Sequence, residues 1–285
     1  MRIILIPVAD RPECANALRT AFEIGKKLDA NLFGCHIRAH RESNVALPAG
    51  LGSLADATAW ESAAKGKTTK KSSAAASALF SEVANRHDYP IIKRPKATSG
   101  AVWIEKVGSP SKVLSNLGPV SDLVIVSRPA TKDGKLARLF LDAALLNTSR
   151  PVLVLPQSRT SAIGKRISIA WNQSAEAAQS VSAAMPMLRH AEQVNIITCG
   201  PESGVGPKSA QLANYLRFWG VKAERVKAPK AKNDAKALMA AYQETNSDLM
   251  VMGAYSHSRL RETMFGGVTE YMLNRANIPV LMLHT

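Results

Sequence analysis

Residues 248–269 read Asp-Leu-Met-Val-Met-Gly-Ala-Tyr-Ser-His-Ser-Arg-Leu-Arg-Glu-Thr-Met-Phe-Gly-Gly-Val-Thr, and this stretch decides the fold. Its apolar start predicts a buried strand that runs directly into Gly253. Gly266 and Gly267 then open a predicted helix over Val268–Arg275, and a further strand is expected at Pro279–Leu283. Glycines at such a turn let the backbone approach a ligand closely, and amides at a helix N-terminus attract phosphate. The stretch therefore predicts a strand, an anion-binding loop and a helix in series.

The same pattern occurs earlier in the chain, which indicates a duplication. Three segments of the first half match three segments of the second half in the same order. A repeat of domain size indicates duplication rather than a solenoid, whose period is about 20–50 residues. A length of 285 residues also accommodates two domains of ordinary size. The matched pairs are Arg2–Pro7 with Arg166–Trp171, Ser121–Val126 with Ser247–Met252, and Ser149–Leu155 with Asn277–Leu283.

The offsets between the two copies locate an insertion in the first one. The starts of the copies are 164 positions apart and their last strands 128 apart, so the first copy is longer by 36 residues. The second strands still align at nearly the larger offset, which places the extra residues near 39–71. We therefore predict a first domain at 1–157 with this insertion, and a second domain at 158–285. Long insertions are usually functional or mobile segments, and this one reads as a long loop with one short helix near Ala55–Ala64.

Strands and helices alternate along both copies, which predicts an α/β fold. The strands are short continuous runs of Val, Ile, Leu and Met, as in parallel sheets buried on both faces. We therefore predict two tandem doubly wound parallel sheets. In such sheets ligands bind beyond the carboxyl ends of the strands. The predicted strands are Arg2–Val8, Ala30–Ile37, Val102–Val107, Asp122–Val126, Pro151–Leu155, Arg166–Trp171, Val194–Cys199, Val221–Ala228, Asp248–Gly253 and Pro279–Leu283, with Tyr89–Pro95 also extended. The predicted helices are Pro12–Leu28, Ser72–Arg86, Ser109–Leu117, Ala175–Leu188, Ser209–Trp219, Asp234–Thr245 and Val268–Arg275.

The spacing within the loop of the second copy resembles the nucleotide loop of the universal stress protein family. The family pattern is Gly, two residues, Gly, nine residues, Gly and then Ser or Thr; the matching residues here are Gly253, Ser256, Gly266 and Gly267. Two positions depart from the pattern, because Ser256 replaces a glycine and Gly267 replaces a hydroxyl residue. The resemblance covers the whole chain and implies a tandem protein of this family, with a Rossmann-like, adenine nucleotide alpha hydrolase-like fold in both domains.

This resemblance implies that the second copy binds an adenine nucleotide, with ATP as the expected cofactor. The helix start offers amides and a favourable dipole for the phosphates. Thr269 could supply the hydroxyl that is missing at Gly267. The residues expected to contact the phosphates are Gly253, Ser256, Gly266, Gly267, Val268 and Thr269.

Polar residues around the loop have both a functional and a structural interpretation. His257 and Arg259 could reach phosphates, or they could belong to a solvated basic loop. Asn172 ends the first strand of the second copy, where the family often has an Asp that contacts adenine or ribose. An amide side chain could make such a contact, because it both donates and accepts hydrogen bonds. Alternatively, Asn172 or Ser174 caps the following helix.

The first copy lacks the glycine loop, so we expect no nucleotide there. Ser127 stands in place of the first glycine, and Pro129 stiffens the turn. The bulky side chains of Arg138–Phe140 stand near the counterpart of Gly266, where they would block close approach of a phosphate.

The composition limits the classes of protein to consider. No apolar run approaches the roughly 20 residues of a membrane span, and the N-terminal Met-Arg-Ile-Ile-Leu-Ile-Pro reads as a strand rather than a signal peptide. The three cysteines are scattered and the six histidines lack metal-ligand spacing, so we predict reduced thiols in a cytoplasmic protein and no metal site. The net charge of +15 is large, but no nucleic-acid-binding motif accompanies it. We expect a solvated basic surface that attracts small anions rather than nucleic acid.

Together these features predict a cytoplasmic stress-response protein that binds a small-molecule nucleotide and has no membrane partner. We expect no enzyme activity beyond weak ATP hydrolysis, since no nucleophile and base follow the strands. Two alternatives stay open: an interaction or regulatory module that binds no nucleotide, which Ser256 and Gly267 favour, and an adenine-nucleotide hydrolase. The resemblance also implies an intramolecular pseudo-dimer through Val152–Leu155 and Val280–Leu283, and a homodimer stays open as well.

Overall fold

The computed structural model divides the chain into two compact units, Met1–Arg159 and Thr160–Thr285. The structure describes residues 1–9, 11–38, 70–94, 96–129, 134–158, 163–202, 205–254 and 267–284. Most of the predicted insertion, including the short helix expected near Ala55–Ala64, lies outside these residues, as do Ser256, His257, Arg259 and Gly266.

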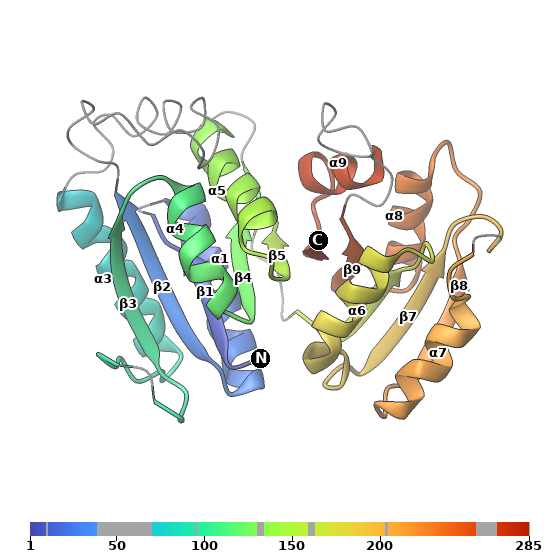
Figure 1. The fold of residues 1–285 in the computed structure, drawn as a ribbon, viewed down its shortest axis with the longest axis horizontal. Helices are drawn as coiled ribbons and strands as arrows, with labels where there is room; N and C mark the ends of the chain where they lie inside the picture. The colour runs from blue at the N-terminus through green and yellow to red at the C-terminus, as the bar shows by residue number, and fades with distance from the viewer. Residues whose placement is uncertain are drawn as a thin grey trace. The chain divides into compact units, whose positions relative to one another are not determined.

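The first unit is a parallel sheet with helices on both faces (Figure 1). Its described elements are β1 (Ile3–Pro7), α1 (Pro12–Leu28), β2 (Asn31–Arg38), α3 (Lys70–Arg86), β3 (Ala101–Val107), α4 (Pro110–Leu117), the 3₁₀ turn η1 (Gly118–Val120), β4 (Leu123–Ser127), α5 (Gly134–Asn147) and β5 (Val152–Leu155). Hydrogen bonds set the strand order β3-β2-β1-β4-β5. Helices α1 and α3 pack together, as do α4 and α5. Because parallel crossovers are right-handed, these two pairs cover opposite faces.

The second unit repeats this topology. Its described elements are β6 (Arg166–Ala170), α6 (Ala175–Leu188), β7 (Gln193–Thr198), α7 (Ser209–Phe218), β8 (Ala223–Lys227), α8 (Asp234–Glu244), β9 (Leu249–Gly253), α9 (Gly267–Asn274) and β10 (Val280–Leu283). The strand order is β10-β9-β6-β7-β8, and all described pairs are parallel. The predicted α/β fold with doubly wound parallel sheets is confirmed.

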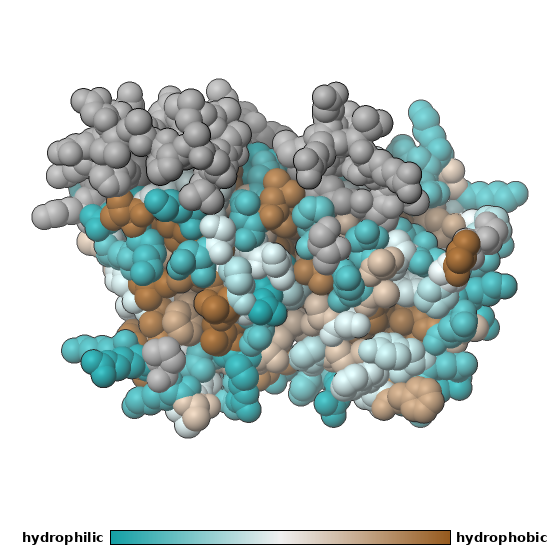
Figure 2. Space-filling view, in the orientation of Figure 1, coloured by the Kyte–Doolittle hydropathy of each residue, from teal (hydrophilic) through white to brown (hydrophobic). Residues whose placement is uncertain are grey.

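Burial follows the apolar runs of the sequence. An interior strand of the first sheet, Leu123–Val126, is at most 4% exposed, and its counterpart Leu249–Met252 is at most 5% exposed. Strands covered on both faces need apolar side chains on both, which explains why these runs do not alternate with polar residues. Some apolar side chains of the first unit are not buried. Figure 2 shows them gathered on the α4 face of this unit.

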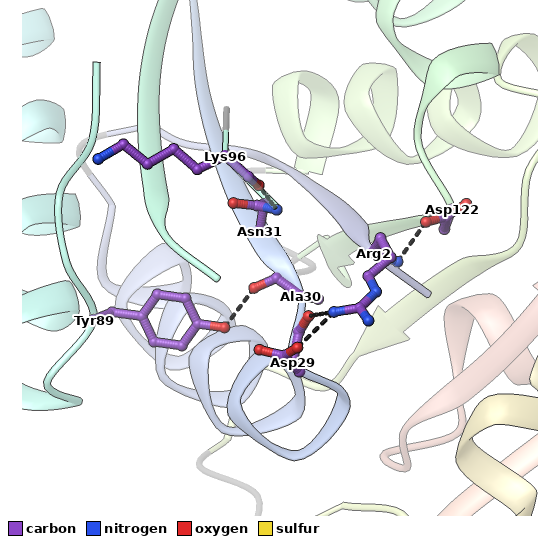
Figure 3. A network of polar contacts seen from close by, with 7 residues as sticks. All are labelled: Arg2, Asp29, Ala30, Asn31, Tyr89, Lys96 and Asp122. Atoms are coloured by element: carbon purple, nitrogen blue, oxygen red, sulfur yellow. Dashed lines mark hydrogen bonds and ion pairs between the residues drawn. The ribbon is translucent and has the colours of Figure 1, made fainter. Parts of the chain in front are cut away.

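A polar network holds the amino ends of the strands in the first unit (Figure 3). The Asp122 carboxylate accepts hydrogen bonds from the backbone amides of Arg2 and Ile3, at 2.5 and 2.9 Å. Arg2 also pairs with Asp29 at 2.5 Å, and the hydroxyl of Tyr89 donates to the carbonyl of Ala30. These bonds fix where β1 begins relative to β4.

The second unit uses the equivalent aspartate in the same way. Asp248 accepts hydrogen bonds from the amides of Gly164, Lys165 and Arg166, at 2.8, 3.0 and 3.0 Å. The aspartate of the Ser-Asp pair that marks the duplication therefore has a structural role, because it ties the first strand of each unit to the fourth.

The structure differs from the sequence prediction in two places. Helix α5 occupies Gly134–Asn147, where no helix was predicted, because that stretch was interpreted only as a degenerate loop. The segment Tyr89–Pro95 was expected to be extended, but among its described residues, 89–94, only Ile91 forms an isolated bridge, to Ala101. With Ile92 also bonded to Ala101, the segment forms a short addition beside β3 rather than a strand.

Candidate functional site

The carboxyl edge of the second sheet brings together the described part of the predicted site. Strands β6 and β9 are neighbours and end side by side, with Ala170 opposite Met252. Strand β6 connects onward to β7 on its other side, so the boundary between β6 and β9 is the topological switch point of this sheet. Ligands bind at such points in open α/β sheets.

Gly253 ends β9 beneath the start of helix α6. A Cβ atom on Gly253 would lie 2.6 Å from the backbone nitrogen of Ala177 and 2.8 Å from the carbonyl carbon of Glu176. Both atoms belong to the first turn of α6, so even alanine would collide with backbone. Close packing of α6 on β9 thus requires this glycine, which the sequence had suggested only as a position for a ligand.

Gly267 has the opposite environment. It begins helix α9, is exposed, and a Cβ atom placed on it would meet no atom of the described residues within 4 Å. The first amides of a helix have no intrahelical acceptor, so they are available to an anion. Val268 is half-buried, and Thr269 is only 6% exposed. The open position in this first turn is therefore Gly267, and a hydroxyl there would face solvent more directly than that of Thr269.

Asn172 lies exposed in the turn between β6 and α6. Its side-chain oxygen accepts a hydrogen bond from the amide of Ser174, at 3.2 Å. The N-cap of α6 is Ser174, whose hydroxyl accepts from the amide of Ala177 at 3.1 Å. Of the two cap candidates in the sequence, Ser174 is thus the cap, and Asn172 shapes the turn that leads into it.

Two neighbours of Asn172, which the sequence analysis did not single out, hold a remote segment against this turn. The indole nitrogen of Trp171 donates to the carbonyl of Pro207 at 2.9 Å, and the side-chain amide of Gln173 donates to the carbonyl of Gly206 at 2.7 Å. A Cβ on Gly206 would lie 2.0 Å from the carbonyl oxygen of Gln173, so the segments touch. Gln173 also has a φ of 64°, an uncommon conformation for a side chain-bearing residue that is enriched at functional sites.

His284 adds a titratable group at the same edge. It follows Leu283, which pairs with Gly253 across β10 and β9. Burial lowers the pKa of His284, and the nearby carboxylate of Glu176 acts in the opposite direction. Burial has the larger effect, so the neutral form of His284 is favoured at this edge.

The corresponding edge of the first unit is filled by side chains. The hydroxyl of Ser127, the counterpart of Gly253, donates to the carbonyl of Glu13 at 3.2 Å. Phe140 lines the remaining cavity together with Val8 and Cys14, and about 40 Å³ is left, room for a few water molecules. The Nε of Arg138 donates to both carboxylate oxygens of Asp142, at 2.8 and 2.9 Å. The cavity volume of about 40 Å³ is far below that of ligand pockets, which begin at about 300 Å³.

No group of three or more His, Cys, Asp or Glu side chains lies close enough together to hold a metal ion in the part of the chain that the structure describes. None of the helices that the structure describes is both long and apolar enough to cross a membrane.

A duplicated α/β unit, with Gly253 and Gly267 near the switch point of its second copy, defines the class of protein. The sequence model of the universal stress protein family matches residues 167–284, so this part of the chain, nearly all of the second unit, belongs to the universal stress protein family. Among curated proteins, the universal stress protein Slr1230 of Synechocystis sp. is 44% identical over 48 residues. That match spans 16% of this chain and 17% of the relative.

Solved structures extend the likeness in fold to both units. A universal stress protein from Archaeoglobus fulgidus DSM 4304 superposes with a TM-score of 0.70, covering 98% of this chain and 94% of its own, at 15% identity. A putative universal stress protein from Pseudomonas aeruginosa UCBPP-PA14 gives a TM-score of 0.54 and 16% identity, with coverage of 99% and 93%. The tandem fold is therefore shared along the whole chain.

Proposed function

We propose that this protein is a stress-response protein that binds an adenine nucleotide, ATP, in its second unit only. The observation that carries the proposal is the open first turn of α9, which begins at Gly267 beyond the end of β9 in a unit of the universal stress protein family. The amides of Gly267, Val268 and Thr269 would hold phosphate oxygens, because a helix N-terminus favours negative charge.

The remaining contacts of this proposal come from the family resemblance. Gly253, Ser256, His257 and Gly266 would complete the phosphate loop, and Asn172 would contact the base or ribose. The bonds from Trp171 and Gln173 to 206–207 support the proposal, since they would order the segment next to Asn172 before a ligand arrives. We place the protein in the cytoplasm and assign it no catalytic residue.

The filled edge of the first unit supports a single site per chain. Phe140 and Ser127 occupy the space that a nucleotide would need, and the cavity of about 40 Å³ is too small for one. Calorimetry with ATP on the intact protein should thus give a stoichiometry near one. Phe140→Ala would enlarge the cavity without supplying a glycine loop, so it should leave this stoichiometry unchanged.

A serine at position 267 provides the sharpest test of the loop. Because a Cβ there meets no atom of the described residues within 4 Å, Gly267→Ser should fold normally and restore the hydroxyl of the family pattern. We expect it to tighten ATP binding about tenfold, the effect of one hydrogen bond to a charged group. Gly267→Ala is the matched control, since it adds the same Cβ without the hydroxyl. Equal affinities for the two variants would show that no phosphate lies at this helix start.

A second candidate function rests on the two departures from the family loop. Ser256 and Gly267 stand where a glycine and a hydroxyl residue are expected, which favours an interaction or regulatory module that binds no nucleotide. In that case neither the wild-type protein nor Gly267→Ser would release heat with ATP at millimolar concentration.

A further inference from the structure

The α4 face of the first unit carries an apolar groove. The groove measures about 340 Å³, within the range of small-molecule sites. Figure 2 shows the apolar side chains that gather on this face. The groove is lined by Ile3, Leu5, Phe33, Ile104, Lys106, Leu117, Val120 and Ser121.

The strand register explains the floor of the groove. Leu5 lies opposite Phe33 across β1 and β2, and Phe33 lies opposite Val102 across β2 and β3. Because side chains alternate along a strand, Ile104 and Lys106 point to the same face as Val102. The other face of β3 is used by Trp103, which packs on Phe80 of α3. The groove is thus the uncovered part of one sheet face.

The second unit shows that the fold itself does not need this groove. Ile167 and Ile196, the counterparts of Ile3 and Phe33, are fully buried, whereas Ile3 and Phe33 are partly exposed. The covering helix differs, since α8 has 11 residues and packs on β7, whereas α4 has only 8. The first unit therefore leaves open a surface that its copy covers.

Two residues of the groove are apolar, whereas the residues at the equivalent positions of the second unit are polar. By strand register, Ile104 corresponds to Lys227, and Val120, just before the shared Ser-Asp pair, corresponds to Asn246. Val120 is 68% exposed, so burial in the fold does not explain an apolar side chain at this position. Such exposed apolar surface commonly marks a binding site.

The polar groups of the groove define the ligand. Lys106 supplies one positive charge, and within the described part of the chain no carboxylate forms an ion pair with it. The hydroxyl of Ser121 already donates to the carbonyl of Gly118, at 2.7 Å. We propose that the groove binds an aliphatic monocarboxylate, a fatty acid, with its chain along Leu5 and Phe33 and its carboxylate at Lys106.

The first experiment measures binding of decanoate to the full-length protein by calorimetry, with octanoate and 1-decanol for comparison. If the chain lies in the groove, each buried methylene should tighten binding about fourfold, so decanoate should bind about fifteenfold more tightly than octanoate. Decanol should bind more weakly than decanoate, because it has no charge for Lys106. Equal binding of decanol would overturn the carboxylate assignment, and no heat from decanoate would overturn the site.

Three variants test the place of binding. Lys106→Gln should weaken decanoate about two- to fivefold, the range of an exposed ion pair, and leave decanol unchanged. Val120→Asn copies the residue of the second unit at an exposed position and should weaken both ligands. Val107→Asn is the matched control, since Val107 is half-exposed on the opposite face of β3 and should change neither affinity. Equal loss in Val107→Asn and Val120→Asn would place the ligand elsewhere.

A second copy of the chain is the alternative occupant of the groove, and light scattering distinguishes dimerisation from fatty-acid binding. If the groove serves dimerisation, the protein should form dimers that Val120→Asn dissociates and decanoate does not affect. That result would overturn the proposal.

Discussion

Replacing Gly253 by alanine should destabilise the second unit by about 2–3 kcal/mol. The new Cβ would lie 2.6 Å from the nitrogen of Ala177 and 2.8 Å from the carbonyl carbon of Glu176, where contact normally begins near 3.5 Å. Both atoms are backbone, so the strain is relieved only by moving the first turn of α6, which also weakens the cap from Ser174. Overpacking accounts for about 1–3 kcal/mol and the cap for about 1, against a gain of up to about 1 from the stiffer unfolded chain.

Urea denaturation followed by circular dichroism measures this effect. With a slope of about 2 kcal/mol per molar urea, the midpoint of the second unit should fall by about 1 M. Gly267→Ala is the control, because its Cβ meets no atom of the described residues within 4 Å, and its midpoint should shift by less than about 0.3 M. If Gly253→Ala shifts the midpoint no further than the control, the packing argument for this glycine is wrong.

Three further predictions concern the network at the amino ends, the acid stability and the last strand. Asp248→Ala removes three amide hydrogen bonds and Asp122→Ala two, so at about 1 kcal/mol each the first change should destabilise its unit more in thermal or urea unfolding. The hydrogen bond from Ser73 is the main cause of the lowered pKa of Glu105. The stability that this bond contributes is therefore present above the usual pKa of a glutamate, and it is lost as pH falls through the lowered pKa. Ser73→Ala should therefore be less stable than wild type at pH 7, and a difference in unfolding free energy that fails to shrink at pH 3 would refute this. Isolated residues 158–285 should self-associate through the open edge of β10, and a fragment that stays monomeric in light scattering would contradict it.

The sequence was sufficient to predict the interior strands of both sheets, because parallel strands buried on both faces need uninterrupted apolar runs. Leu123–Val126 and Leu249–Met252 are such runs and are nearly inaccessible to solvent. Helix α5 was missed for a physical reason. Arg138 and Phe140 were considered only as obstacles to a phosphate, although Arg138 and Asp142 are four residues apart and form the ion pair typical of a helix face.

The candidate site could be predicted only in part. Asn172, Gly253 and Gly267 lie at the expected sheet edge, since their positions follow from the strand-helix order alone. The bonds of Trp171 and Gln173 to residues 206–207 could not be predicted, because the partners are 36 and 33 positions apart and carry no shared motif. The steric need for glycine at 253 likewise depends on how closely α6 approaches β9, and sequence spacing does not report that distance.

Calorimetric titration of the intact protein with ATP, beside Gly266→Leu and Phe140→Ala, tests the central claim most directly. We predict one ATP per chain for wild type and for Phe140→Ala, and loss of binding in Gly266→Leu with the protein still folded by circular dichroism. No heat from the wild-type protein at millimolar ATP, or equal binding by Gly266→Leu, would contradict a nucleotide site in the glycine loop of the second unit.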